Sequence, residues 1–433
     1  MHQVSEFSKF SIDEITKIEG AAGLDVTIKN GQVETVHFAI EEYKRFFTQA
    51  MVGKQIMAIP QMLARICGTC SNAHLMASIE AVEKGFGIQP SDQTKILRAL
   101  TYHGLIIRDH ALHLYMFVMP DMFGKDSLLE FDEANETEHQ MLHDAFAVKA
   151  VGNHLAILVA GRSVHAPYPM PGGFIRFPEK EAIQNFLKEL KAIRPAVLRL
   201  IDVFMKCPFS LIRETNYIAL KANSFSYLEG ELWDMHGRIT DESGYRDHLE
   251  RVVIPYSEAS GYKFDGETYR VGALARLNIN REALHPNTKR DTVEALKKFP
   301  SHDVYTTNLA QAISILHSVD DTLEILEKNT FEKEPLQKVL PHAAVCVGVV
   351  EAPRGTLYHM YETDAKGIVK RGEVIVPTGQ NQITIEADLG EFIQKNLSME
   401  QDILSLECEK IIRAYDPCMS CASHFLKLKI KEV

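Results

Sequence analysis

Cys67-Gly68-Thr69-Cys70 and Cys418-Met419-Ser420-Cys421 stand near opposite ends of this chain and contain four of its seven cysteines. Thiolates are soft, strongly donating ligands, and four of them from two short loops can enclose one or two transition-metal ions. The two pairs therefore predict a metal site. Such a site can form only if the two ends of the polypeptide meet in the folded protein.

The spacing of the cysteines leaves several kinds of site open. Structural zinc sites of this type usually place the second pair about 15 to 20 residues after the first, whereas 347 residues separate Cys70 from Cys418. A local zinc ribbon is therefore excluded. A long-range zinc site, an iron–sulfur site, a rarer metal centre and a pair of redox disulfides all stay open at this point.

The bulk properties are those of an ordinary globular protein. Of its 433 residues, 45% are hydrophobic and 24% are charged, so the chain can bury a substantial core. The formal charge of −11 argues against a nucleic-acid partner. The sequence has no apolar run near 18 residues and no signal-peptide pattern at its start, so we expect no transmembrane segment and a cytoplasmic protein.

The residues around the two pairs extend the pattern. Arg65-Ile66 precedes the first pair and His74 follows it, while Asp416-Pro417 precedes the second pair and His424 follows it. This combination resembles the large, catalytic subunit of the NiFe hydrogenases. Other stretches resemble further blocks of that family: Ile15-Thr16-Lys17-Ile18-Glu19-Gly20, Glu351-Ala352-Pro353-Arg354-Gly355 and Val376-Pro377-Thr378. The segment Val271–Asn278 is most similar to the soluble, coenzyme-linked branch.

The resemblance implies the chemistry of the four cysteines. In the family all four thiolates bind nickel, and two of them also bridge to an iron that carries carbon monoxide and cyanide. By motif position, Cys67 and Cys418 correspond to terminal ligands, while Cys70 and Cys421 correspond to bridging ligands. The implied substrate is H2, and its heterolytic cleavage needs a base beside the metal to take the proton. Cys418 is the local candidate, because a terminal thiolate has a free lone pair.

The resemblance also implies roles for charged residues. Glu19 matches a glutamate that relays the proton away from the metal. Arg354 corresponds to an arginine whose guanidinium lies over the open metal position, where its permanent charge and rigid fork of donors suit a small bound ligand. Asp109 and Asp416 match carboxylates that pair with or flank this arginine.

Four further residues complete the expected site. Thr378 resembles a hydroxyl residue that hydrogen-bonds an iron-bound cyanide, and Pro353 is expected to lie against the same cofactor. His74 stands where an imidazole supports the cluster from outside. His424 matches a ligand of a separate structural cation, magnesium or iron.

Each assignment has a competing interpretation. The cysteines could hold a plain zinc ion or form disulfides, and Glu19 could be an exposed carboxylate at the start of a strand. Asp109 and Arg354 could form an ordinary ion pair. His74 could be a core imidazole, and Thr378 after Pro377 could be a turn residue.

One region departs from the family pattern. Relatives usually carry an Arg-Gly-x-Glu string after the relay glutamate, and its carboxylate helps to hold the structural cation. Here the corresponding region reads Lys44-Arg45-Phe46-Phe47-Thr48-Gln49, without the glutamate. Either Glu41 or Glu42 substitutes for it, or the cation is bound differently or is absent.

The chain is not expected to act alone. Hydrogen oxidation releases electrons, and the three remaining cysteines, Cys207, Cys346 and Cys408, cannot hold a four-thiolate iron–sulfur cluster. We therefore expect a small partner subunit with iron–sulfur clusters, together with further diaphorase or ferredoxin-like subunits. A hydrogen sensor, a structural subunit of an electron-transfer complex and a zinc-stabilised protein of unrelated activity are the alternatives.

The hydrophobic pattern predicts an α+β fold with a large, mainly helical core, peripheral antiparallel hairpins and a buried metal site between the two Cys motifs. Residues 21–40 alternate apolar and polar around Asn30-Gly31, which predicts a hairpin, and spacings of three and four predict helices elsewhere. We expect a single domain over residues 1–433 with these parts: a hairpin region at 15–40, a helical core at 55–205 and 305–330, β-rich regions at 208–280 and 343–386, a final helix at 403–412 and a metal-binding loop at 416–424.

Overall fold

The computed structural model describes residues 7–42 and 46–423. Its helices and strands follow the expected α+β class, with long helices and several small, mostly antiparallel sheets. The helices are α1 (Phe47–Ala50), α2 (Ile59–Leu63), α3 (Ser71–Phe86), α4 (Asp92–Ala111), α5 (Met119–Met122), α6 (Glu136–Ala160), α7 (Lys180–Met205), α8 (Ala273–Asn280), α9 (Pro286–Asp291), α10 (Val293–Leu296), α11 (Thr306–Lys328), α12 (Pro377–Lys395), α13 (Gln401–Ala414) and α14 (Met419–Ala422).

Within residues 7–42 and 46–423, the strands form five small sheets. Those sheets have the orders β1-β2-β3, β4-β5, β11-β6-β7-β8, β10-β9 and β12-β13-β14, and among these described strands only β11 and β6 pair in parallel. The strands are β1 (Phe7–Ile12), β2 (Ala22–Lys29), β3 (Gln32–Ile40), β4 (Pro169–Met170), β5 (Gly173–Phe174), β6 (Asn216–Lys221), β7 (Glu231–Asp234), β8 (Ile239–Thr240), β9 (Leu249–Val253), β10 (Ser260–Phe264), β11 (Tyr269–Arg270), β12 (Val345–Ala352), β13 (Gly355–Thr363) and β14 (Val369–Ile375).

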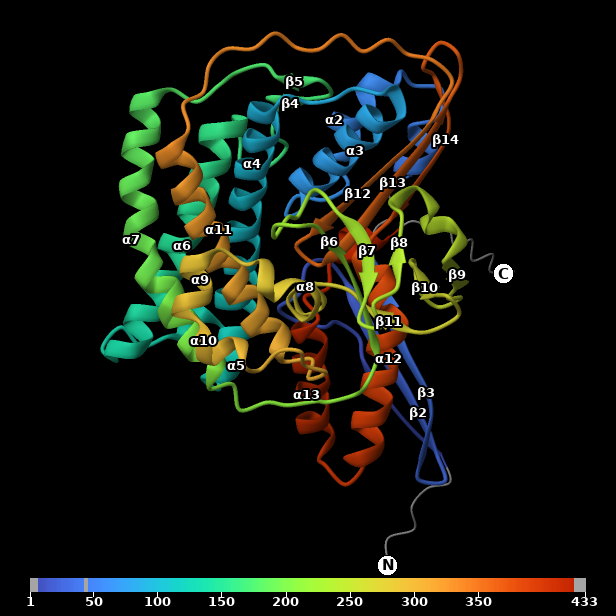
Figure 1. The fold of residues 1–433 in the computed structure, drawn as a ribbon. Coiled ribbons are helices and arrows are strands. Elements are labelled where there is room, and N and C mark those ends of the chain that lie inside the picture. Colours follow the sequence, from blue (N-terminus) through green and yellow to red (C-terminus); the bar gives the residue numbers. More distant parts are fainter. Residues whose placement is uncertain (1–6, 43–45, 424–433) are drawn as a thin grey trace, which may run out of the picture.

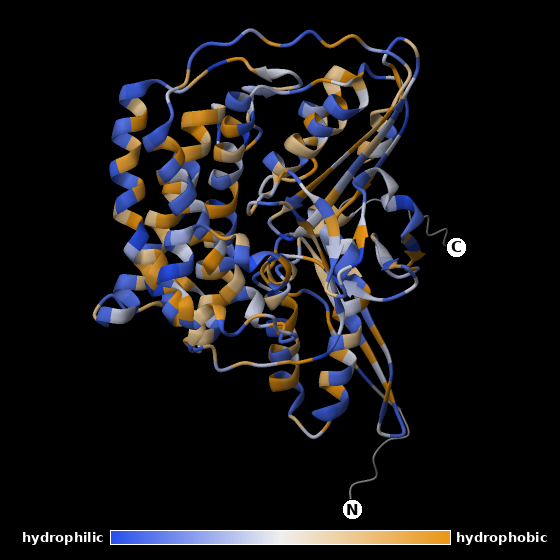
Figure 2. Cartoon of the chain, viewed as in Figure 1, coloured by the Kyte–Doolittle hydropathy of each residue, from blue (hydrophilic) through white to orange (hydrophobic). Residues whose placement is uncertain are grey.

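Four long helices, α4, α6, α7 and α11, pack together into a bundle on one side of the molecule (Figure 1). Along α7, at the edge of this bundle, hydrophobic and hydrophilic residues alternate with the helical period (Figure 2), and its apolar stripe from Ile183 to Phe204 is buried. In the described part of the chain, no helix is both long enough and apolar enough to cross a membrane.

The second half of the fold is built around α3 and the sheet β12-β13-β14. Helix α3 lies against β12 and β13, and Gly348 of β12 makes this contact possible, because a Cβ there would collide with the carbonyl oxygen of Ala77. The first Cys pair immediately precedes α3. The sheet therefore fixes the position of one half of the expected metal site.

The other Cys pair follows α13, which ends at Ala414. Asp416 has φ +52°, a left-handed conformation that aspartate tolerates better than most residues. It turns the chain toward Pro417, and Cys418 then forms a parallel bridge with Glu19, just before β2. Segments from the N-terminal and C-terminal parts of the described chain thus meet, as the sequence predicted.

The structure also differs from the expected elements. The hairpin at residues 21–40 is present as β2 and β3, but β1 adds a third strand to it. Two stretches expected to be rich in strands contain helices instead, α8 and the first half of α12. A π-helical segment at Leu112–Val118, between α4 and α5, was not predicted.

Candidate metal centre

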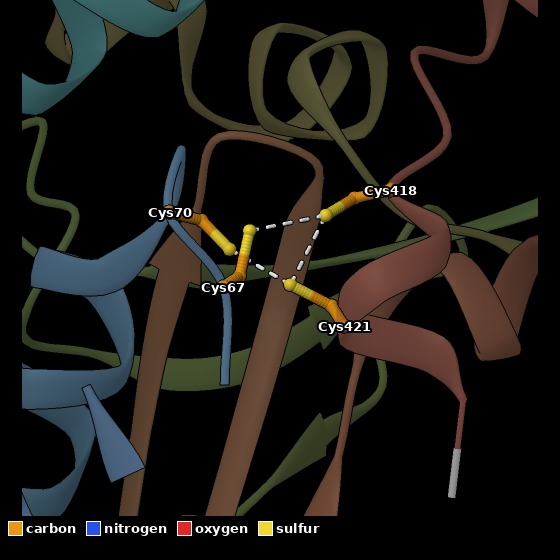
Figure 3. Close-up of side chains that lie close together, drawn as sticks. All are labelled: Cys67, Cys70, Cys418 and Cys421. Carbon is orange, nitrogen blue, oxygen red and sulfur yellow. Dashed lines mark hydrogen bonds between the residues drawn. The ribbon is translucent and has the colours of Figure 1, made fainter. Parts of the chain in front are cut away.

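The four motif sulfurs meet in one buried cluster (Figure 3). Their Sγ atoms all lie within 4.8 Å of one another. The Sγ atom of Cys67 is 3.5 Å from that of Cys418, and the Sγ atom of Cys70 is 2.8 Å from that of Cys421. Cys70 caps the N-terminus of α3, and Cys421 lies in the short helix α14.

Burial raises the pKa of three of these four thiols. It raises the pKa of Cys70 to about 11, and it raises the pKa of Cys418 and Cys421 well above the usual range. Hydrogen bonds, first of all from Cys418, lower the pKa of Cys67. A cation among the four sulfurs would reverse the cost of burying thiolates, because a coordinating thiol is deprotonated by the metal. The soft donor set fits nickel and iron better than magnesium or calcium.

Glu19 lies directly against the sulfur cluster. Its Oε2 is 3.0 Å from Cys418 Sγ and accepts a hydrogen bond from the backbone N–H of Ser420 at 3.2 Å. The backbone of Met419 also donates to the carbonyl of Glu19. Gly20 has φ +84°, and a Cβ there would come within 2.7 Å of Met419 Cβ, so this close approach requires glycine. Glu19 is half-buried, between the cluster and the surface.

Arg354 joins two carboxylates beside the cluster. Its Nη1 donates to Asp109 Oδ2 and its Nη2 donates to Asp416 Oδ1, both at 2.8 Å, and all three side chains are buried. Burial raises the pKa of Asp109 against the opposing attraction of Arg354. The Arg354 Nε–H has no hydrogen-bond partner among the described residues. A buried donor of this kind is stabilised by a ligand or a bound water.

His74 and Thr378 contact the two C-terminal cysteines. His74 Nε2 is 3.5 Å from Cys421 Sγ, and burial lowers the pKa of this imidazole to about 4. Thr378 is the second residue of α12, where its Oγ1 accepts a hydrogen bond from the backbone N–H of Cys418 at 2.9 Å. Thr378 therefore lies in a helix rather than in a turn.

A small cavity adjoins the sulfurs on the side of Arg354. Apolar groups and a few polar ones surround it, and its lining consists of Cys70, His74, Ala352, Pro353, Arg354, Leu357, Pro377, Thr378, Cys418 and Cys421. Pro353 thus lies next to the cluster. The cavity offers small ligands of a metal an apolar surround with donors at its edge.

Two residues of the site were not predicted from the sequence. Gln311 of α11 donates from Nε2 to Asp416 Oδ2 at 2.8 Å and so holds the second oxygen of that carboxylate. Arg276 of α8 donates to the carbonyls of Ala352 and Pro353 at 2.9 and 3.1 Å. Arg276 stands in the segment Val271–Asn278, which marked the subfamily, so its charge could have suggested a supporting role. Gln311 gave no such signal.

His424 lies outside the described residues, and so do Lys44 and Arg45 of the region that departs from the family pattern. Next to them, Ser423 Oγ donates to the carbonyl of Glu42 at 2.8 Å, and Glu42 Oε2 accepts from the backbone N–H of Ala21 at 3.1 Å.

Known proteins that resemble this chain identify its family. A family model described as nickel-dependent hydrogenase matches residues 45–156 and 235–424. The chain belongs to this family. It is the large subunit of a hydrogenase, an oxidoreductase that acts on H2, and its cluster of four cysteines could hold a metal ion.

Curated relatives are similar in sequence to this chain over nearly its whole length. The hydrogenase is 31% identical over 420 residues to the alpha subunit of sulfhydrogenase 2 from Pyrococcus furiosus, with 96% of this chain and 99% of the relative covered. It is 28% identical over 467 residues to one subunit of the F420-non-reducing hydrogenase from Methanothermobacter thermautotrophicus, with 98% and 96% covered.

Solved hydrogenases share the fold. An NAD+-reducing [NiFe]-hydrogenase in the H2-reduced state superposes with a TM-score of 0.84 at 24% identity, covering 96% of this chain and 99% of that chain. A Ni-Fe-Se hydrogenase from Desulfomicrobium baculatum gives a TM-score of 0.77 at 20% identity, with 96% and 100% covered.

Proposed function

We propose that this subunit carries out the reversible, heterolytic cleavage of H2 at a nickel–iron centre held by Cys67, Cys70, Cys418 and Cys421. One observation carries the proposal: four buried sulfurs from the two ends of the chain lie within 4.8 Å of one another, with the Glu19 carboxylate in contact with one of them. When bound, the metals supply a Lewis acid that polarises H2 and takes up its two electrons.

In this proposal the ligands follow the family order. By the motif positions, Cys67 and Cys418 would hold nickel, and Cys70 and Cys421 would hold both nickel and an iron that carries carbon monoxide and cyanide. The cavity beside the sulfurs suits small uncharged and anionic ligands of a metal, because its lining combines apolar groups with hydrogen-bond donors. Thr378 is one such donor: its oxygen accepts from the Cys418 backbone, which leaves its hydrogen available to a cyanide.

The proton leaves through Cys418 and Glu19. Cys418 Sγ takes the proton, and Glu19 Oε2, 3.0 Å away, accepts it from the sulfur. Because Glu19 is only half-buried, its carboxyl can then pass the proton toward solvent. The backbone N–H of Ser420 holds the same Oε2 in place.

Arg354 holds a fixed positive charge at the edge of the cavity. Its two carboxylate partners, Asp109 and Asp416, fix the plane of the guanidinium, so that the Nε–H, which has no partner among the described residues, is held ready for a bound ligand. The proposed roles of Asp109 and Asp416 are therefore to orient Arg354.

Electrons require partner subunits. Outside the cluster of four, the sequence has three cysteines, too few to hold a four-thiolate iron–sulfur cluster. The direct electron acceptor in this proposal is a small iron–sulfur subunit, with diaphorase or ferredoxin-like subunits beyond it. The proposed compartment is the cytoplasm, in keeping with seven free thiols and no disulfide among them.

A second, structural cation, magnesium or iron, is proposed at His424, with Glu42 in place of the missing family glutamate. The hydrogen bond from Ser423 to the Glu42 carbonyl supports this assignment, because it brings the neighbour of His424 to Glu42.

The test is metal analysis and turnover of the purified complex. We expect nickel and iron bound to this subunit, infrared bands from iron-bound carbon monoxide and cyanide, and H2-dependent reduction of an artificial electron acceptor. Stoichiometric zinc without nickel would refute the proposal, and a loaded complex without turnover would favour a hydrogen sensor or a structural subunit.

The role of Glu19 has its own test. Glu19→Gln should lower H2 oxidation by roughly 10²- to 10⁴-fold, the usual contribution of a positioned acid or base, with unchanged nickel content. Glu19→Asp keeps the carboxyl and should retain more activity. Full turnover in Glu19→Gln would exclude this residue from the proton path.

A further inference from the structure

A buried line of hydrogen-bonding groups leads away from Cys421 and ends at α3. His74 Nε2 is 3.5 Å from the sulfur of Cys421, and the other ring nitrogen, Nδ1, is 3.0 Å from His359 Nε2. His359 Nδ1 is 2.6 Å from the hydroxyl of Tyr361, which is 2.9 Å from Ser78 Oγ. His74, His359, Tyr361 and Ser78 are all at most 1% exposed.

The fold brings these residues together from distant parts of the sequence. His359 and Tyr361 are two residues apart on β13, so their side chains share one face of the sheet. Gly348 of β12 pairs with His359 and lets α3 approach so closely that a Cβ at this glycine would lie 2.6 Å from the Ala81 nitrogen. His74 and Ser78, one helical turn apart on α3, then contact His359 and Tyr361 respectively.

The number of protons on each group fixes which atom donates in each hydrogen bond of this line. A metal-bound thiolate only accepts hydrogen bonds, so His74 must carry its proton on Nε2 to donate to Cys421. A neutral His74 then presents an unprotonated Nδ1, which must receive its hydrogen bond from His359 Nε2. His359 in turn has an unprotonated Nδ1, and the Tyr361 hydroxyl is the donor it needs.

The last residue of the line plays a different part. The Tyr361 hydroxyl has one hydrogen, which rotates and can be donated either to Ser78 Oγ at 2.9 Å or to His359 Nδ1 at 2.6 Å. Donation to His359 is the arrangement that the tautomer of His74 requires. Tyr361 sets the direction of the line, and Ser78 does not.

We propose that His359 and Tyr361 are positioning residues that fix the tautomer of His74, so that its Nε2–H is held on the sulfur of Cys421. The inference rests on the proposed function, in which Cys421 would be a ligand of both metals. An N–H on a ligand sulfur withdraws electron density from it and so weakens its donation to the metals. Without the Tyr361 hydroxyl, His74 can adopt the other tautomer and turn a lone pair toward the sulfur.

The test uses the loaded complex with its partner subunits and reads the infrared stretches of iron-bound carbon monoxide and cyanide. In Tyr361→Phe these bands should shift to lower wavenumber or split into two sets, because the sulfur then donates more strongly in part of the population. Tyr358→Phe is the matched control: Tyr358 is a buried tyrosine on the same strand that takes no part in this line. Its bands should stay in place.

Two more variants make the inference sharper. Ser78→Ala should leave the bands unchanged, because Tyr361 still donates to His359. Where Tyr361→Phe yields no loaded complex, His359→Gln and His359→Leu decide the question. The glutamine amide can donate to His74 and should keep the bands, whereas leucine cannot and should shift them.

Unshifted bands in a metal-loaded Tyr361→Phe complex would overturn the inference, and so would equal shifts in His359→Gln and His359→Leu. Absence of the bands in the wild-type complex is a separate result, which would count against the proposed function itself.

Discussion

Arg354 combines a buried charge with a rigid geometry, since its two terminal nitrogens each donate to a different carboxylate. Removing one partner of a buried ion pair typically costs about 3 to 5 kcal/mol, because the other charge stays buried without compensation. A lysine keeps the charge but cannot hold both Asp109 and Asp416 in one plane.

We therefore expect Arg354→Lys to lower H2 oxidation by roughly 10²-fold, the usual effect of losing one preorganised donor, and to lower the midpoint of thermal unfolding. Activity assays and calorimetry on the loaded complex measure the two effects. Arg98→Lys is the control, because Arg98 makes a buried two-pronged pair with Glu83 outside the site. It should lose stability but keep turnover. Equal turnover in both variants would contradict the prediction.

At the level of single residues, the sequence identified the site residues that stand in short motifs shared with the family. The four cysteines, Glu19 and Arg354 belong to such strings, and the structure brings them together at one site. Their assigned roles stay predictions. Gln311 and His359 were not found, because each is an ordinary polar residue in its own element. Their importance comes only from tertiary contacts, such as that between His74 and His359, 285 positions apart.

Among the elements, helix α12, like α8, lies in a stretch that was expected to be rich in strands. The strand signals before residue 376 are real, since β12, β13 and β14 lie there. The helix begins at Pro377, where proline suits the first helical position. Its β-branched residues Ile383, Thr384 and Ile385 favour a strand locally, but packing against β3 and β10 decides for the helix.

Glu386 of α12, where the helix packs against β3, makes the free energy of unfolding depend on pH. Its Oε1 accepts hydrogen bonds from the Phe38 backbone at 3.0 Å and from Tyr256 at 2.9 Å, and burial raises its pKa from 4.5 to about 7. Because the folded state holds this proton more tightly than the unfolded state, the free energy of unfolding falls as the pH rises from about 4.5 to 7. Above about pH 7 the free energy of unfolding no longer changes through this group.

Glu386→Gln removes this titration and keeps an oxygen for both donors. Relative to the wild type, the variant should gain stability between about pH 5 and pH 8, by roughly 2 to 3 kcal/mol. Urea unfolding of both proteins at the two pH values measures the change. A difference in unfolding free energy that stays the same at both pH values would contradict the prediction.

For the whole molecule, the metal site ties the start of the chain to its end. We propose that residues 1–433 fold as a single unit, in which the cluster closes the chain. A ligand that binds only the folded state stabilises it by about 4 kcal/mol at a thousandfold excess over its dissociation constant. Metal removal should therefore lower the midpoint of thermal unfolding by several degrees.

Calorimetry of metal-loaded and metal-free protein measures this difference. Cys408→Ser, a buried thiol of α13 outside the cluster, should show the same gap between loaded and metal-free forms as the wild type. Cys418→Ser should show no gap. A wild-type protein whose midpoint is insensitive to the metal would contradict the proposed closure.

The distance in sequence between the two Cys pairs also sets the order of events during translation. Synthesis at about 5 to 20 residues per second means that Cys421 is added roughly 20 to 70 s after Cys70. Until then the nascent polypeptide presents only half of its sulfur ligands, as an open dithiol that oxidants and thiophilic ions can reach. A metal site that needs all four sulfurs can consequently be completed only after the C-terminal Cys pair has left the ribosome.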